Sequence, residues 1–233
     1  MAVLYLLPAY LGGNSSSEIF SQQLKNVLKE IKFFASENEK TARKFIKFIS
    51  PDIDQKSLSF SILNKRTSDE EILQLAEPLE KGIDMGLISE AGLPCIADPG
   101  NKLVMWCHQN KIKVVPINGP SSILLALISS GLNGQNFSFH GYLPIENNEK
   151  KKEIIKLETL SRKDGSAHIF METPYRNQKM FEDLLKYLSP LTMLCIATNL
   201  TLPDEAIQTL SCKQWKTVKP DIHKKPTIFI IQS

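Results

Sequence analysis

The sequence has little that would tie the protein to a membrane, a disulfide framework or a metal. It contains only four cysteines in 233 residues, and their wide spacing gives no paired metal-ligand pattern. We therefore favour reduced thiols in a cytoplasmic protein over disulfides or a zinc site, and we predict no metal. No apolar run is long enough to cross a bilayer, so we expect no membrane partner. No pattern of Ser, His and Asp suggests a hydrolytic triad.

A secretory signal and a strong net charge are also lacking. No Lys or Arg precedes the first apolar residues and no small-residue cleavage pattern follows them, so we expect Val3–Leu7 to form a strand. Lys and Arg number 28 against 25 Asp and Glu, which gives a formal net charge of +3. This weak charge permits an anionic partner without requiring one. No repeat, low-complexity tract or flexible linker is present.

What the chain does have is an alternation of strand-like and helix-like segments. Hydrophobic residues make up 42% of the sequence and charged residues 23%, as in an ordinary globular protein. In the first half, apolar strand-like segments alternate with amphipathic helical ones, which predicts a mainly parallel sheet with helices on its faces. Ser68 and Glu71 form a capping-box pattern at the start of one such helix, and Ser15 and Glu18 at another.

The second half has a different sequence pattern, and its segment 206–210 could be either a strand or a helix. We predict an α/β protein of two domains, residues 1–117 with a mainly parallel sheet and residues 118–233 with a mixed sheet. The boundary falls near the Asn118-Gly119-Pro120 turn, which we interpret as a hinge rather than a tether.

The most informative segment is Leu87–Gly100, whose sequence is LISEAGLPCIADPG. An apolar strand ends in it at Ser89, and Gly and Pro residues then break the chain twice. Asp98 followed by Pro99 is typical of a helix start, so we expect Asp98 to be the N-cap of a helix. Loops at the carboxyl ends of parallel strands bind ligands in α/β proteins. This segment is therefore the first candidate for a functional site.

Four motifs, taken in order, resemble those of the tetrapyrrole-methylase superfamily. They are LISEAGLPCIADPG, VVPINGPSS at 114–122, FSFHGYLP at 137–144 and METPYR at 171–176. Members of that superfamily are S-adenosylmethionine-dependent methyltransferases with two α/β domains. The resemblance is strongest to the branch that methylates a ribose 2′-hydroxyl of small-subunit ribosomal RNA. One motif would be weak evidence, but four in one order across nearly the whole chain are specific.

The resemblance implies a cofactor cleft between the two domains, formed by loops in which glycines let the backbone approach a ligand closely. Each loop also has an ordinary structural reading, such as a helix cap at Asp98 or a turn before an exposed Tyr142. The residues that the resemblance assigns to S-adenosylmethionine are Pro8, Ser89, Glu90, Ala91, Gly92, Asp98, Gly119, Pro120, Ser121, Ser122, Gly141, Tyr142, Leu143 and Glu172.

Charged positions depart from the branch's pattern. Its A-E-D-T-R segment carries Asn38 in place of Asp and Lys40 in place of Arg, and its R-E-L-T-K segment is TNLTL at 198–202. No catalytic residue follows from the sequence, and a general base remains unknown. Candidates for the acceptor side are Glu37, Lys40, Arg43 and Arg176. Basic residues close together on one helix, such as Lys40 and Arg43, more commonly form a solvated helix face than a binding site. The same applies to Lys150–Lys152.

The leading hypothesis is an S-adenosylmethionine-dependent RNA methyltransferase active in rRNA processing, with small-subunit rRNA as its partner. The resemblance also implies a homodimer. Two alternatives stay open: a methyltransferase for a tetrapyrrole or another small molecule, and a catalytically inactive cofactor- or ribosome-binding protein. The lost charges at Asn38, Thr198, Asn199 and Leu202 motivate the inactive alternative.

Overall fold

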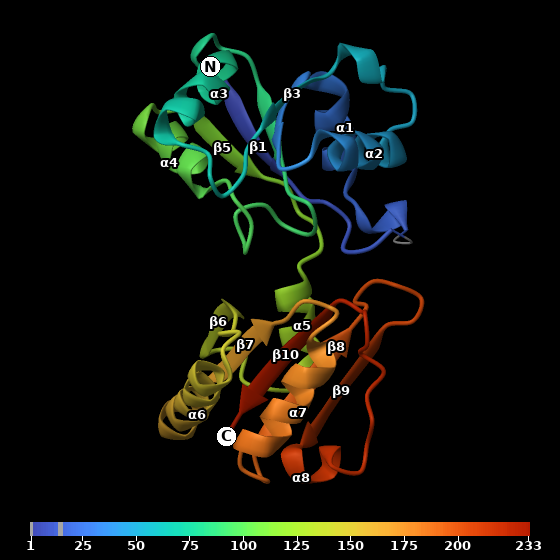
Figure 1. Cartoon of the computed structure of the whole chain (residues 1–233). Helices are drawn as coiled ribbons and strands as arrows, with labels where there is room; N and C mark the ends of the chain where they lie inside the picture. The colour runs from blue at the N-terminus through green and yellow to red at the C-terminus, as the bar shows by residue number, and fades with distance from the viewer. Residues whose placement is uncertain (1, 14–15) are drawn as a thin grey trace. The chain divides into compact units, whose positions relative to one another are not determined.

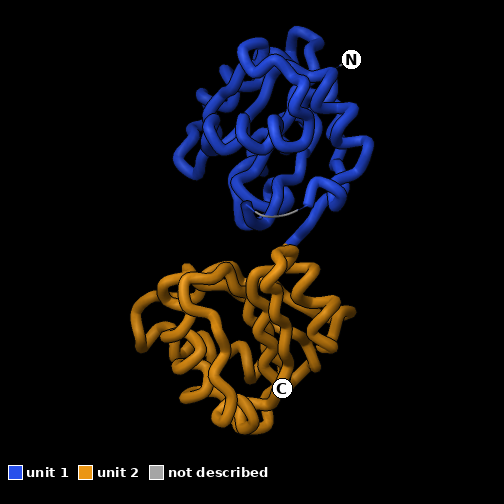
Figure 2. The backbone as a smooth tube through the Cα atoms, turned by 90° about the vertical axis from the view of Figure 1, so that its right-hand side faces the viewer, with its two compact units in different colours: residues 1–121 blue, residues 122–233 orange. Residues whose placement is uncertain are grey.

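The chain folds into two compact units, residues 1–121 and 122–233, in a computed structural model that describes residues 2–13 and 16–233 (Figure 2). The division lies four residues after the predicted boundary at 117. The backbone N–H of Ile117 donates to the Leu6 carbonyl at 3.0 Å, and Gly119 packs directly against Pro8. Residues 118–121 therefore continue the first unit. No described helix is long and apolar enough to span a membrane.

The first unit is a five-stranded, wholly parallel sheet in the order β3-β2-β4-β1-β5 (Figure 1). Its elements are β1 (Val3–Leu7), η1 (Ser17–Ile19), α1 (Gln22–Glu30), β2 (Phe33–Ser36), α2 (Glu39–Ile49), η2 (Gln55–Ser57), β3 (Ser59–Ile62), α3 (Asp69–Glu80), β4 (Met85–Ile88), α4 (Asn101–Gln109) and β5 (Lys113–Pro116).

Helices cover both faces of this sheet. On one face α1 and α2 bury side chains such as Leu24 and Phe45 against Phe34 of β2, and on the other α3 and α4 bury Leu75 and Trp106. Because both faces are covered, the three central strands β1, β2 and β4 are mostly apolar rather than alternating. The predicted capping box of α3 is confirmed, since the Ser68 side chain accepts from the Glu71 backbone N–H.

The second unit has a mixed sheet in the order β6-β7-β10-β8-β9, in which only the β6–β7 pair is parallel. Helices α6, α7 and α8 pack on one face, and α5 contacts β8, β9 and β10. Its elements are α5 (Ser122–Ser130), β6 (Phe137–Tyr142), α6 (Asn147–Asp164), β7 (Ala167–Met171), α7 (Asn177–Tyr187), β8 (Met193–Thr198), β9 (Ala206–Ser211), α8 (Cys212–Trp215) and β10 (Thr227–Gln232). The predicted fold class is confirmed, and the ambiguous segment 206–210 is a strand.

Two of the predicted helix starts are wrong. Helix α4 begins at Asn101 after Gly100, not after Asp98. Helix α1 begins at Gln22 with Ser21 as its N-cap. The capping box predicted at Ser15 falls on a residue outside the described ones. In each case the chain makes an extra turn before the helix, which local capping patterns do not reveal.

Lys150 is the other departure, because it is buried rather than part of a solvated basic face. Its Nζ donates to Asp183 Oδ2 at 3.0 Å, and Lys179 Nζ donates to Asp183 Oδ1 at 2.8 Å. Burial by itself would raise the pKa of the Asp183 carboxyl, but the hydrogen bonds from Lys179 and Lys150 outweigh it and lower the pKa. The ion pair thus ties α6 to α7 in the second unit.

Replacing Lys150 with Met should destabilise the protein by about 2–4 kcal/mol, because it leaves a buried carboxylate short of one partner. Lys152→Met, on an exposed position of the same helix, should change stability by less than about 0.5 kcal/mol. Urea unfolding measures both variants. Equal stabilities of the two variants would contradict a buried ion pair, and Asp183→Leu added to Lys150→Met should restore part of the loss.

Candidate functional site

The candidate site lies at the carboxyl edge of the parallel sheet, where β1, β4 and β5 are neighbours. The segments that follow β1 and β4 are joined by a short antiparallel bridge: Ala9 N–H donates to the Gly92 carbonyl at 2.8 Å and Gly92 N–H donates to the Ala9 carbonyl at 3.2 Å. The Ser89 hydroxyl donates to the Gly92 carbonyl at 3.0 Å. The 89–92 loop is therefore held in one shape beside Pro8.

Gly92 and Gly119 allow the segment after β5 to pack closely against the segments that follow β1 and β4. A Cβ on Gly119 would lie 2.1 Å from the Cβ of Pro8, far inside contact distance. Gly92 has φ of +70°, and a Cβ there would lie 3.3 Å from the Pro120 carbonyl oxygen. The structure thus brings the predicted residues Pro8, Gly92, Gly119 and Pro120 together, through close approaches that side chains would block.

The loop between Gly92 and Gly100 has an unusual backbone. Besides the two glycines, Cys95 and Ala97 have left-handed φ values of +69° and +64°. For residues with a Cβ this conformation costs about 1–2 kcal/mol each, and such strain is concentrated at functional sites. The repeated left-handed turns also explain why the helix starts late and why Asp98 is free of the capping role predicted for it.

Three carboxylates converge at this edge, from the segments after β2 and β4. Burial raises the pKa of Asp98 to about 6, with the nearby Glu37 adding to the effect and Lys65 opposing it. Burial, and then the charge of Glu90, likewise raise the pKa of Glu37. The Thr41 hydroxyl orients Glu90 by donating to its Oε1 at 2.5 Å. Glu37 and Asp98, which are half-buried, and the exposed Glu90 therefore form an acidic cluster that favours a positively charged ligand.

Two hollows open beside these carboxylates. One of about 200 Å³ is lined by Leu63, Asn64, Lys65, Thr67, Asp98, Pro99, Gly100, Asn101 and Lys102. A smaller one of about 60 Å³ is lined by Ala9, Tyr10, Thr41, Ala42, Phe45, Ser89 and Glu90. Ala9, Thr41 and Lys65 were missed by the sequence-based reasoning. Lys65 could have been found from its place just after β3, since all parallel strands end at the same edge.

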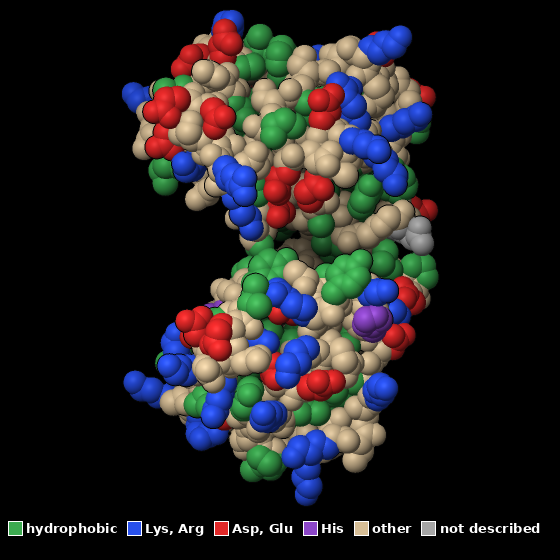
Figure 3. Space-filling model, in the orientation of Figure 1, with side chains coloured by type: hydrophobic (Ala, Val, Ile, Leu, Met, Phe, Trp, Pro, Cys, Tyr) green, Lys and Arg blue, Asp and Glu red, His purple; other side chains and the backbone are tan. Residues whose placement is uncertain are grey.

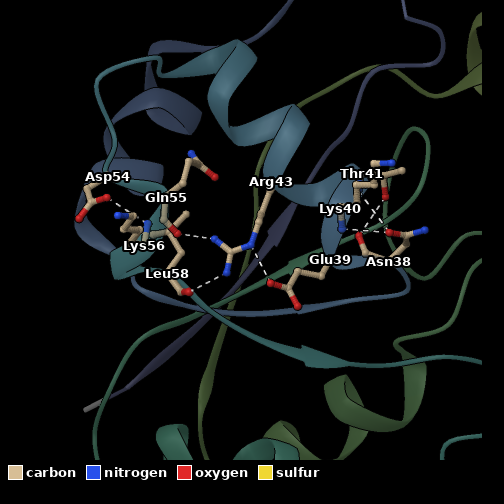
Figure 4. Close-up of polar contacts among 9 residues, drawn as sticks. All are labelled: Asn38, Glu39, Lys40, Thr41, Arg43, Asp54, Gln55, Lys56 and Leu58. Atoms are coloured by element: carbon tan, nitrogen blue, oxygen red, sulfur yellow. Dashed lines mark hydrogen bonds and ion pairs between the residues drawn. The ribbon is translucent and has the colours of Figure 1, made fainter.

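Of the residues predicted for the acceptor side, Arg43 is engaged within the first unit (Figure 4). Its guanidinium pairs with Glu39 at 2.7 Å and donates to the carbonyls of Gln55 and Leu58. It also stacks over the Phe60 ring at 4.5 Å. Three of its five N–H donors are thus engaged in fastening α2 to the chain around β3.

Asn38 and Lys40 take different positions around the same helix start. Asn38 is the N-cap of α2, and its Oδ1 accepts from the Lys40 backbone N–H at 2.9 Å (Figure 4). Asn is as good a cap as Asp, so the loss of the charge leaves the helix start intact. The Lys40 side chain is exposed.

The remaining predicted residues belong to the second unit, at the end of its β6–β7 pair. Gly141 has φ of +65°, Tyr142 is 53% exposed and Leu143 is buried. Tyr142 pairs in register with Met171, just before Glu172. Glu172 is buried and its Oε1 accepts from Arg176 Nη2 at 2.6 Å and Nε at 3.0 Å. Glu172 and Arg176 thus bind each other, which gives both a structural role.

The residues around the unit boundary divide accordingly. Ser121 is buried at the end of the first unit, and Ser122 is the first residue of α5 in the second. Ala91 is exposed on the 89–92 loop.

Among the described residues no group of three or more His, Cys, Asp or Glu side chains has the arrangement of a metal site.

The chain resembles known proteins both in sequence and in structure. A family model described as Tetrapyrrole (Corrin/Porphyrin) Methylases matches residues 14–214. "Ribosomal RNA small subunit methyltransferase I" of Vibrio cholerae is 31% identical over 206 residues, which are 88% of this chain and 67% of that protein. The protein of the same name from Bacillus subtilis is 32% identical over 188 residues, 81% of this chain and 60% of that protein. The matched segment thus spans roughly two thirds of these relatives' length.

Solved structures share the fold. The methyltransferase CobJ superposes with a TM-score of 0.62 at 15% identity, covering 100% of this chain and 93% of that one. The uroporphyrin-III-C-methyltransferase from Thermus thermophilus superposes with a TM-score of 0.55 at 14% identity, covering 99% and 94%. At such low identity these neighbours show the fold alone.

Replacing Asp98 with Asn should stabilise the protein at neutral and higher pH. A carboxyl whose pKa is raised from 3.8 to about 6 contributes stability at low pH that is lost as the pH rises through about 6. Asn removes the cost of ionisation, by about 1 kcal/mol after allowance for solvent screening. Urea unfolding of both proteins between about pH 4 and pH 8 measures the gain, which should vanish at the acidic end. A variant that is less stable at the alkaline end would contradict it.

Replacing Gly119 with Ala should destabilise the protein by about 1–3 kcal/mol, because the new methyl group must push Pro8 aside. Gly13→Ala is the matched control, since a Cβ on Gly13 meets no atom within 4 Å. Its effect should stay within about 0.5 kcal/mol. Thermal unfolding compares the two variants, and equal melting temperatures would show that the close approach at Gly119 is not rigid.

Proposed function

The chain belongs to the tetrapyrrole methylase family, and on that premise we propose that it methylates RNA with S-adenosylmethionine as the methyl donor. The acceptor in this proposal is a ribose 2′-hydroxyl of small-subunit rRNA. The relatives at 31% and 32% identity, both named as rRNA methyltransferases, support an RNA acceptor. The proposal includes the homodimer, which rests on the resemblance, and the cytoplasmic location, which rests on the spacing of the four cysteines.

The acidic cluster of Glu37, Glu90 and Asp98 beside the Gly92 and Gly119 contacts is the observation that carries this proposal. When bound, S-adenosylmethionine supplies a methyl group activated by a positively charged sulfur. The residues present fit that chemistry, because three neighbouring carboxylates attract a cation, and the two that are half-buried, Glu37 and Asp98, attract it more strongly than in water. Backbone groups of the glycine-containing loops that follow β4 and β5 would hold the adenosine and amino acid moieties of the donor.

Asp98 is the residue that we assign to the acceptor's proton. A ribose hydroxyl must lose its proton as the new bond to oxygen forms, and a general base works best when its pKa lies near the operating pH. With a pKa of about 6, the Asp98 carboxylate is mostly ionised at neutral pH and is a stronger base than an ordinary Asp. The proton of the hydroxyl is transferred to this carboxylate, and burial, followed by the neighbouring Glu37 and Glu90 charges, keeps its pKa raised.

On the acceptor side, Lys40 is the best supported of the predicted residues. Its ammonium is exposed at the start of α2, on the same helix as Lys44 and Lys47, and can contact phosphate. Arg43 and Arg176 support RNA binding indirectly, by fixing α2 and the Glu172 turn. A tetrapyrrole acceptor has weaker support, since the uroporphyrin-III-C-methyltransferase shares only 14% identity with this chain.

Isothermal titration with S-adenosylmethionine should show one site per chain, and Asp98→Asn should weaken it while leaving the protein folded. The protein should also transfer labelled methyl groups to small ribosomal subunits from cells that lack it. The rate of this transfer should decrease when the pH is lowered below about 6, because Asp98 is then protonated. Binding of the donor without transfer to RNA would favour the inactive alternative. A failure to bind S-adenosylmethionine would overturn the proposal itself.

A further inference from the structure

Tyr175 is a large aromatic side chain that the fold leaves open to solvent. It lies in the turn between β7 and α7, and 74% of its surface is exposed. It is absent from the residues assigned above to the donor or to the proton transfer. Single exposed apolar side chains are common on protein surfaces, so it is the surroundings of the ring that indicate what it could bind.

The turn that carries Tyr175 is held rigidly from several sides. Pro174, just before it, accepts a hydrogen bond from Lys224 N–H at 3.1 Å. The buried Asn177 amide donates to the carbonyl of Lys225 at 2.7 Å and to that of Ile222 at 3.3 Å. Arg176, just after the ring, is locked to Glu172. These bonds join the 172–177 turn to the 222–225 segment, so the ring is presented on a pre-organised support.

Lys224 is the second component of this surface. Its Nζ lies 5.8 Å from the centroid of the Tyr175 ring, within the range of a cation–π contact. Its backbone has φ of +59°, a left-handed conformation that is uncommon for Lys. The neighbouring Lys225 pairs with Asp204 and Asp221, whereas Lys224 has no ion pair among the described residues. The fold therefore holds one cation against one exposed aromatic ring.

We propose that Tyr175 and Lys224 form a stacking platform for an unpaired nucleobase of the RNA substrate. This inference rests on the proposed function, since it assigns part of the same substrate. Unstacked bases pack on aromatic faces, and a nearby ammonium contacts the phosphate of the same strand. The ring would stack on the base, and Lys224 would contact the adjacent phosphate. A base-paired strand presents no free π-face, so the ring would not increase the affinity of the protein for it.

The charge pattern of the second unit favours this local mode of binding. On the face drawn in Figure 3, Lys and Arg side chains are interspersed with Asp and Glu over this unit, without a broad region of one sign. The whole chain has a formal net charge of only +3. Affinity for RNA then depends on specific contacts more than on a general positive field, and stacking is such a contact.

Fluorescence anisotropy with a labelled unpaired RNA of about 10 nucleotides tests the platform in the full chain, with the same RNA annealed to its complement as comparison. Tyr175→Ala should weaken binding of the unpaired RNA about 5- to 100-fold without changing its salt dependence. Tyr175→Phe should bind within about two-fold of the wild type, since the ring is kept. Lys224→Ala should lower the slope of log affinity against log salt by about 0.7.

Lys186→Ala is the matched control for charge. Lys186 Nζ lies 5.2 Å from the ring of Tyr187, at the other end of α7, and its loss should leave RNA affinity unchanged. Circular dichroism melting should show all variants folded, because Tyr175 is exposed. Equal affinities of wild type and Tyr175→Ala for unpaired RNA would overturn the platform alone. An equal loss for unpaired and paired RNA would also overturn it, and a wild type that binds S-adenosylmethionine but no RNA would overturn both it and the RNA acceptor.

Discussion

The parallel pairing of β1 with β4 and β5 is the constraint on which the candidate site depends. Parallel strands start at one edge of a sheet and end at the other, so segments far apart in sequence emerge side by side. Apolar helix layers on both faces hold that sheet in place. At the carboxyl edge, glycines at 92 and 119 then let three segments touch where any side chain would separate them. The site is thus a consequence of strand order first and of individual residues second.

The same edge is where the protein carries its least favourable local energies. Left-handed Cys95 and Ala97 strain the loop, and burial next to Glu37 disfavours the ionised form of Asp98. Such costs are maintained when they serve a ligand, because a cation bound there relieves the repulsion between carboxylates. Stability and donor binding therefore oppose each other at Asp98. Stability is supplied elsewhere, by the apolar layers of each unit and by buried pairs such as Lys150 with Asp183.

Much of the fold was predictable, since the alternation of apolar and amphipathic segments is a local property and the four motifs are contiguous. The contacts that could not be predicted are those between residues that lie far apart along the chain. Arg43 bonds to carbonyls at 55 and 58, and Lys150 pairs with a carboxylate 33 residues away. In neither case does the sequence of the helix that carries the charge indicate its partner. Asp98 failed for a different reason: its sequence fits an N-cap, but two non-glycine residues adopt a conformation that sequence patterns do not predict.

The central claim is that ionised carboxylates at the carboxyl edge of the first unit attract the positive charge of the methyl donor. The most direct test compares the affinities of S-adenosylmethionine and of S-adenosylhomocysteine, its neutral thioether, as a function of pH. The account predicts that the wild type prefers the cation, that this preference falls as the pH is lowered through about 6, and that Asp98→Asn reduces it. Equal affinities for the two ligands at every pH, in wild type and variant, would contradict it.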